Sequence, residues 1–172
     1  AQAITGNKVV PDNCVGAAKI TATGGDILAI VNDSLNYTVQ SAAYNAVSAA
    51  QTGTTIALPL FRSNHTAWRL YTGISAMNAG TGDASIQIEV TDSEGNVLAG
   101  RAGMQVTGVG AGETALFWPG NFATTGNWAV VSKAYGSATI TSDQPLAVIV
   151  NDTSLIGSAD SSTYNGINAS VQ

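Results

Sequence analysis

The chain of 172 residues is long enough for one large domain with a substantial core. Only 10% of its residues are charged, and the net charge of -5 with 6 Lys and Arg residues argues against nucleic-acid binding. No stretch reaches the roughly 18 consecutive apolar residues of a membrane helix, so we expect no membrane span. A polar, weakly charged composition is typical of secreted, assembling β-proteins.

The first 13 residues predict a short extended arm that ends in a turn. Its apolar residues are Ile4, Val9 and Val10. Because such an arm buries little by itself, we expect these three residues to form a subunit interface as a strand donated to a neighbouring sheet. A frayed terminus is the alternative.

The first three residues, Ala-Gln-Ala, are expected to be the product of signal-peptide cleavage, which implies a secreted or cell-surface protein. Cys14 has no second cysteine to pair with, so it is expected to be either a buried small residue or an intermolecular link.

An internal repeat organises the chain. Residues 26–33 (Asp-Ile-Leu-Ala-Ile-Val-Asn-Asp) recur as residues 145–152 (Pro-Leu-Ala-Val-Ile-Val-Asn-Asp). Matched blocks precede and follow this pair in the same order, at 15–22 with 135–142 and at 41–47 with 161–167. The period of about 120 residues is the size of a domain. We therefore expect a β-sandwich over residues 14–172 that contains the duplicated segments 15–50 and 135–170.

In the first repeat copy, residues 18–22 predict a strand, residues 23–26 a tight turn and residues 27–31 a fully buried strand, which together form a hairpin. A polar loop is expected over residues 32–40. Residues 41–50 have some helical propensity, but we expect them to be extended because two copies of one unit should share one structure.

The middle of the chain predicts further strands. Residues 54–61 form one whose Pro59 indicates an edge or a bulge. Residues 68–78 alternate, and in residues 84–91 the alternation places Ile86, Ile88 and Val90 on one face. The stretch 92–96 (Asp-Ser-Glu-Gly-Asn) predicts a hairpin turn, which is favoured over a calcium loop because it lacks the spacing of a known calcium site.

Strands are also predicted at 104–109, 113–118 and 128–131, followed by the second copy of the hairpin at 137–150. No segment shows sustained helical periodicity, and turn signals recur every 8–12 residues or so. The expected fold class is all-β: an antiparallel β-sandwich, Ig-like or jelly-roll-like.

Several motifs resemble one known family. They are the Tyr-Asn-Gly at 164–166, the Ile-Ala-Leu-Pro-Leu strand at 56–60, the strand at 68–78 and the Gly-Ser-Ala-Thr-Ile-Thr-Ser-Asp-Gln-Pro-Leu-Ala-Val-Ile-Val-Asn stretch at 136–151. In their order and spacing they resemble the tandem β-sandwich repeats of bacterial cell-surface proteins. The resemblance covers most of residues 41–170 and implies no catalytic residues. Where the family forms long arrays, this sequence has one unit with the end of another unit at its front.

This departure suggests that protomers reproduce the array noncovalently. We expect a homopolymer that grows head to tail into an extracellular filament or surface layer, by strand donation between protomers. One structural alternative is that both copies lie in one sandwich, related by pseudo-twofold symmetry. The alternative function is a monomeric carbohydrate-binding or adhesive module, with extracellular polysaccharide as partner and with Trp68, Trp118 and Trp128 as its aromatic face.

Catalysis, a cofactor and a metal site are not expected. His65 is the only histidine, and no nucleophile motif accompanies it. Asp33 and Asp152 recur with the repeat and are interpreted as residues that close turns, and Tyr44 and Tyr164 as packing residues. Candidate glycosylation sites follow from five Asn-x-Ser/Thr triplets, at Asn32, Asn36, Asn64, Asn151 and Asn168.

Overall fold

The computed structural model describes residues 16–35, 40–67, 69–99, 104–118, 127–128, 133–154 and 161–170. These residues form an antiparallel all-β fold, as the sequence predicts, with a single short 3-10 helix at Ala49–Gln51. The strands are β1 (Ile30–Leu35), β2 (Gln40–Asn45), β3 (Gly53–Ser63), β4 (Leu70–Asn78), β5 (Ala84–Asp92), β6 (Val97–Ala99), β7 (Met104–Val109), β8 (Thr114–Phe117), β9 (Asn127–Trp128), β10 (Ala134–Ser154), β11 (Ser161–Asn165) and β12 (Ile167–Asn168).

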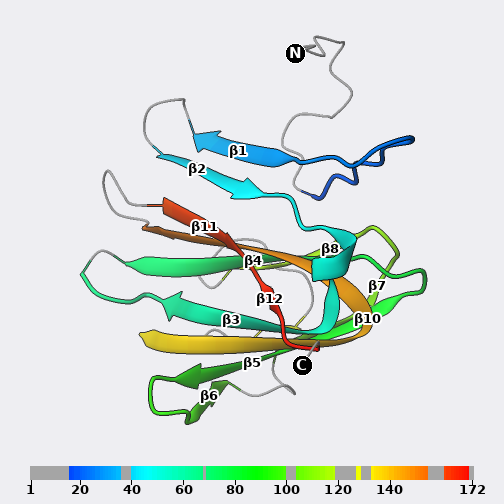
Figure 1. The fold of residues 1–172 in the computed structure, drawn as a ribbon. Coiled ribbons are helices and arrows are strands. Elements are labelled where there is room, and N and C mark those ends of the chain that lie inside the picture. Colours follow the sequence, from blue (N-terminus) through cyan, green and yellow to red (C-terminus); the bar gives the residue numbers. More distant parts are fainter. Residues whose placement is uncertain are drawn as a thin grey trace.

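The long strand β10 joins the two layers of the sandwich (Figure 1). Its first half pairs with β3 on one side and β5 on the other. Its second half pairs with β4 and β11. The prediction of a hairpin at 137–150 is therefore wrong, because the chain passes through this stretch without reversing.

The turn-forming residues in the middle of β10 bond to the β4–β5 loop and to the start of β5 instead of closing a hairpin. The carboxylate of Asp143 accepts the Ser85 N–H at 2.8 Å, and the Pro145 carbonyl accepts the Ala79 N–H at 2.8 Å. Pro145 has no N–H to leave unpaired at the point where β10 changes partners. These bonds satisfy the polar groups of the bend and let β10 serve both layers.

The predictions for residues 54–96 are confirmed over the described residues, whereas the strand predicted at 128–131 lies mostly outside them. In β5 the side chains of Ile86, Ile88 and Val90 are buried on one face. Pro59 lies at an irregularity of β3, where the register with β10 shifts between Gly136 and Ala138. The hairpin turn between β5 and β6 also forms, with Gly95 at a φ of 88°.

The core lies between the layers of the sandwich. It is built from the inward-facing residues of β3, β4, β5, β7, β8 and β10, and its largest fully buried side chains are Phe61, Phe117, Ile56, Leu58, Ile86, Ile88, Met104, Ile140, Leu146, Val90, Val148 and Val150. Four of these twelve come from β10, so the C-terminal repeat copy (135–170) is central to the core.

The N-terminal repeat copy (15–50) forms a separate two-stranded sheet, β1–β2. In it Val31 pairs with Tyr44 and Asn32 with Ala43, just as Val150 pairs with Tyr164 and Asn151 with Thr163 in β10–β11. The duplication is therefore present in the register of the two hairpins. Among the described residues the two copies share no ladder, so they do not form one continuous sheet.

Three predictions for the N-terminal copy are wrong. Residues 18–22 form no strand, and only the bend at 23–25 matches the predicted hairpin. Strand β1 begins at Ile30 and runs into the stretch predicted to be a polar loop. Residues 27–31 are not fully buried: Ile27, Leu28 and Ile30 are exposed, and the other two are partly buried. In the part of the chain that the structure describes, β2 alone pairs with this stretch. The extended prediction for residues 41–50 is confirmed over β2 and is wrong at its end, where the 3-10 helix Ala49–Gln51 begins.

Candidate assembly surface in the N-terminal repeat copy

A buried ion pair fixes the C-terminal copy to the sandwich. The Asp152 carboxylate in β10 is 1% exposed and pairs with the Arg62 guanidinium of β3. It also accepts a hydrogen bond from the Thr72 hydroxyl of β4 at 3.1 Å, and that hydroxyl accepts the Arg62 backbone N–H at 2.9 Å. The prediction that Asp33 and Asp152 close turns is wrong, because they lie within the strands β1 and β10.

The equivalent residue of the N-terminal copy has no such partners. Asp33 lies in β1 with its side chain exposed. Within the described part of the chain, its carboxylate makes no hydrogen bond or ion pair. No strand equivalent to β3 or β4 lies beside β1 there, because β1 pairs only with β2. The equivalent aspartates therefore differ: Asp152 is buried and paired with Arg62, whereas Asp33 is exposed.

The apolar residues of the two copies differ in the same way. Ile140 and Leu146 are completely buried, whereas their equivalents Ile20 and Ile27 are 60% and 54% exposed. Leu28, which follows Ile27, is 88% exposed, and Ile30 is 61% exposed. We call residues 27–31, together with the edge of β1 that does not face β2, the head segment. It combines an apolar surface with a strand edge that pairs with no described residue.

The equivalent tyrosines of the two copies, Tyr44 and Tyr164, are both partly buried. Tyr164 packs against the core, and its hydroxyl donates a hydrogen bond to the Leu60 carbonyl of β3. Burial raises the pKa of Tyr164 to about 12. Burial also raises the pKa of Tyr44, with the charge of Asp33 as a second cause. The interpretation of Tyr164 as a packing residue is confirmed.

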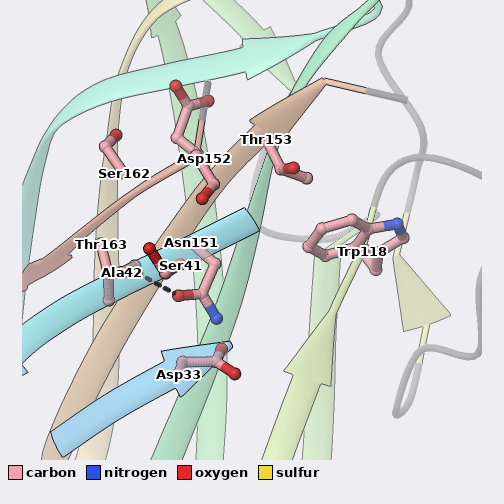
Figure 2. Close-up of a pocket in the computed structure, with 10 residues that line it drawn as sticks. Asp33, Ser41, Ala42, Trp118, Asn151, Asp152, Thr153, Ser162 and Thr163 are labelled. Atoms are coloured by element: carbon pink, nitrogen blue, oxygen red, sulfur yellow. Dashed lines mark hydrogen bonds between the residues drawn. The ribbon is translucent and has the colours of Figure 1, made fainter. Parts of the chain in front are cut away.

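The two hairpins lie beside each other, with β2 next to β11 (Figure 1). The Asn165 side-chain amide donates to the Asn45 carbonyl at 3.0 Å, so equivalent positions of the two copies meet. The hairpins and Trp118 border an open cleft of about 180 Å³, which is lined by Asp33, Ser41, Ala42, Trp118, Asn151, Asp152, Thr153, Ser161, Ser162 and Thr163. Figure 2 shows this cleft, with the hydrogen bond from the Thr163 hydroxyl to Asn151.

Of the remaining candidates from the sequence, Trp118 lines this cleft, whereas His65 is not among its lining residues. The His65 ring stacks on Tyr135 with ring centres 4.9 Å apart. The Trp118 ring lies against the Gly73 backbone. The side chains of Trp68 and Trp128 lie outside the described residues, so the predicted aromatic row is untested.

The Asp92 carboxylate is used by its own turn. It accepts the Glu94 and Asn96 backbone N–H groups and the Asn96 side-chain amide. These hydrogen bonds, led by that from the Asn96 side chain, lower the pKa of Asp92. Across the ranges that the structure describes, no group of three or more His, Cys, Asp or Glu side chains is placed to hold a metal ion. Nor does any described helix have the length and apolarity to cross a membrane.

The candidate glycosylation sites differ in their surroundings. Asn32 is exposed in β1, and Asn64 is partly buried with a φ of 49°. The side chains of Asn151 and Asn168 are hydrogen bonded, the first to Thr163 and the second to the Thr52 carbonyl and the Ser170 N–H. Asn36, like Cys14 and the predicted interface residues Ile4, Val9 and Val10, lies outside the described residues.

The sequence showed the repeat that makes this comparison possible, but it did not show Arg62 and Thr72 as partners of Asp152. Those residues lie 90 and 80 positions before Asp152, and no neighbouring sequence motif marks either of them as its partner. In comparisons with known proteins, the chain matches no protein-family model, no curated protein and no solved structure.

Proposed function

We propose that this chain is a structural subunit of the cell exterior that assembles head to tail into a filament or surface layer, through its N-terminal repeat copy. One observation carries the proposal: the same sequence pattern is core at one end of the chain and exposed at the other. Ile140 is fully buried, and its equivalent Ile20 is 60% exposed.

The exposed copy has the properties of a contact surface. Residues 27–31 are apolar and β-branched in the main, a composition that favours a strand with neighbours on both sides. In the C-terminal copy, the equivalent residues have such neighbours in β4 and β11. A second protomer that covers this surface would remove apolar area from water and pair the edge of β1 at the same time.

The composition supports the location outside the cell. A chain with 10% charged residues and 19 glycines is of the kind found in secreted, assembling β-proteins. The proposal assigns no catalytic role and no cofactor. Strand donation by residues 1–13 remains a second proposed contact, and the deletion described below tests it separately.

The test is electron microscopy and sedimentation velocity on the unmodified chain, the Ile27→Asp variant and a deletion lacking residues 1–13. Filaments from all but Ile27→Asp are expected, because a buried carboxylate would oppose the contact. Ile167→Asp is the matched control, since Ile167 is 56% exposed and Ile27 is 54% exposed. Loss of filaments on deleting the arm alone would make residues 1–13 the donor. Monomers from the unmodified chain at every concentration would contradict the proposal.

A carbohydrate-binding module is the second candidate, and the cleft between the two hairpins favours it. This cleft is lined by two carboxylates, one of them paired with Arg62, and by an amide, several hydroxyl groups and one indole ring. Such groups bind sugar hydroxyls and stack on sugar rings. Affinity electrophoresis against neutral and acidic polysaccharides tests it. A monomer that is retarded by one polysaccharide, and less so after Asp33→Ala, would favour this function over assembly.

A further inference from the structure

The loop between β3 and β4 and the residue that precedes β10 share an unusual backbone conformation. All four non-glycine residues with a positive φ in the described chain lie here: Asn64 at 49°, Thr66 at 62°, Arg69 at 47° and Lys133 at 61°. Residues with a Cβ rarely adopt this left-handed conformation, and a branched Cβ like that of threonine opposes it most. Such residues persist where the surrounding structure imposes the conformation, and they cluster at functional sites.

The pairing of the strands brings these residues together at one end of the sandwich (Figure 1). The start of β10 pairs with the end of β3 through Ala134 and Ser63, so Lys133 lies beside the β3–β4 loop. At the far end of the same loop, Arg69 donates its backbone N–H to the Thr66 carbonyl at 3.2 Å. Lys133 and Arg69 therefore belong to one surface, although they are far apart in the chain.

An aromatic ring is fixed on this surface. Tyr135 is 49% exposed, and its ring stacks on the His65 ring. Beneath the stack, the His65 Nδ1 atom and the hydroxyl of the completely buried Ser63 make no hydrogen bond with a described residue. Buried polar atoms without a partner are rare in folded proteins, so a pair of them two positions apart is a further unusual feature. The stack holds Tyr135 in one orientation while much of its surface faces solvent.

Two cations accompany the tyrosine. Lys133 and Arg69 are exposed, and neither makes an ion pair with a described residue. The whole chain has 11 Asp and Glu residues against 6 Lys and Arg residues, so two exposed cations beside one aromatic ring oppose the general charge of the protein. Neither cation lines the cleft between the two hairpins, and nor does Tyr135.

The carboxylates of the adjoining strands and turns are already bonded. Asp152 pairs with Arg62, the residue that lies opposite Tyr135 in the ladder of β3 and β10. Asp92 and Glu94 both accept hydrogen bonds from the side-chain amide of an asparagine in their own turn. Lys133 and Arg69 are therefore available to a negatively charged ligand.

We propose that Tyr135, Lys133 and Arg69 form a binding site for an acidic polysaccharide, with a sugar ring stacked on the tyrosine and the sugar carboxylates at the two cations. A sugar ring presents an apolar face that packs on an aromatic ring, and carboxylates form charge-assisted hydrogen bonds with guanidinium and ammonium groups. A small inorganic anion would use only the cations, and a neutral glycan only the ring. The combination selects a glycan that carries negative charge.

The backbone of the loop supports this assignment. Left-handed residues on both sides of the stacked rings hold the cations in place before the ligand arrives, which reduces the entropy that binding costs. The inference goes beyond assembly and does not depend on it. A subunit with this site would attach to an extracellular acidic glycan whether it is a monomer or part of a filament.

The experiment is affinity electrophoresis of the dilute full-length chain in gels that contain polygalacturonate, alginate or hyaluronate, with neutral dextran for comparison. At least one acidic polysaccharide is expected to retard the chain, dextran is not, and added salt should weaken the retardation. The dissociation constant is expected to rise by at least about tenfold in Tyr135→Ala and in the double variant Arg69→Ala with Lys133→Ala. Tyr135→Phe keeps the ring and should bind like the unmodified chain.

Lys19→Ala is the matched control for charge, because Lys19 is also exposed but lies in the N-terminal repeat copy. Both Lys19→Ala and Asp33→Ala, which alters the cleft, should change the dissociation constant by less than about twofold. Thermal unfolding of every variant checks that the fold is retained. The inference fails if no acidic polysaccharide retards the chain, if dextran retards it equally, or if either control weakens binding as much as the double variant. A chain that binds but never polymerises would contradict the proposed function alone.

Discussion

In the C-terminal repeat copy, Ile140 and Leu146 are completely buried between strands of the sandwich, and Asp152 is paired with Arg62. In the N-terminal copy, Ile20 and Ile27 expose more than half of their surface. The two hairpins nevertheless have the same register. Local sequence therefore determines the hairpin, whereas burial depends on the strands that the rest of the chain places beside it.

The largest difference is expected at the paired aspartates. Asp152→Ala removes the buried carboxylate that pairs with Arg62 and accepts the Thr72 hydroxyl, and should lower the free energy of unfolding by about 3–5 kcal/mol. Asp33→Ala removes an exposed carboxylate and should change it by less than about 0.5 kcal/mol. Urea unfolding of the monomeric protein measures both values. Equal effects would mean that Asp33 has a partner comparable to Arg62 and that the two copies do not differ in this way.

An intermediate difference is expected at two equivalent glycines. A Cβ at Gly136 would collide with the Thr91 carbonyl of β5 and lie 2.8 Å from the Asp92 Cα, whereas a Cβ at Gly16 would meet nothing within 4 Å. Gly136→Ala should therefore lower the free energy of unfolding by about 1–3 kcal/mol through overpacking, whereas Gly16→Ala should leave it almost unchanged. Thermal unfolding distinguishes the two. A comparable loss for Gly16→Ala would show that residue 16 is packed in the folded chain.

The smallest difference is expected at the tyrosines, and it depends on pH. Tyr164→Phe removes the hydrogen bond to the Leu60 carbonyl and should lower the free energy of unfolding by about 0.5–1.5 kcal/mol. Tyr44→Phe should lower it by less. The pKa of Tyr164 is raised from 10.0 to about 12 in the folded protein. The contribution of the protonated Tyr164 hydroxyl to the free energy of unfolding is therefore complete below about pH 10 and is lost as the pH rises toward 12. Ultraviolet absorbance follows the phenolate. An unchanged titration above pH 10 in Tyr164→Phe would contradict this assignment.

Much of the fold could be predicted from the sequence, because its signals are local. The alternation of Ile86, Ile88 and Val90, the turn at 92–96 and the bulge at Pro59 each depend on a few consecutive residues. The continuous strand β10 was missed for the same reason: Ser142 to Pro145 have turn-forming side chains, and only their bonds to the β4–β5 loop show that they serve as a bend.

Only part of the candidate surface could be predicted from the sequence. The repeat itself was visible in the sequence, but the exposure of residues 27–31 was not, because an apolar run does not show whether strands will cover it. The ion pair of Asp152 with Arg62 joins residues far apart in the chain. That Asp33 makes no such pair with a described residue could be recognised only by comparing the two copies in space.

Hydrogen–deuterium exchange, measured on the dilute protomer and on the concentrated protein, tests the central claim most directly. In the protomer, amides of residues 16–29 should exchange almost immediately and those of residues 136–150 slowly, because only the latter are in a paired strand. On assembly, residues 27–31 should gain protection while residues 136–150 stay unchanged. Equal protection of both copies in the dilute protomer, or no gain of protection in the polymer, would contradict the account.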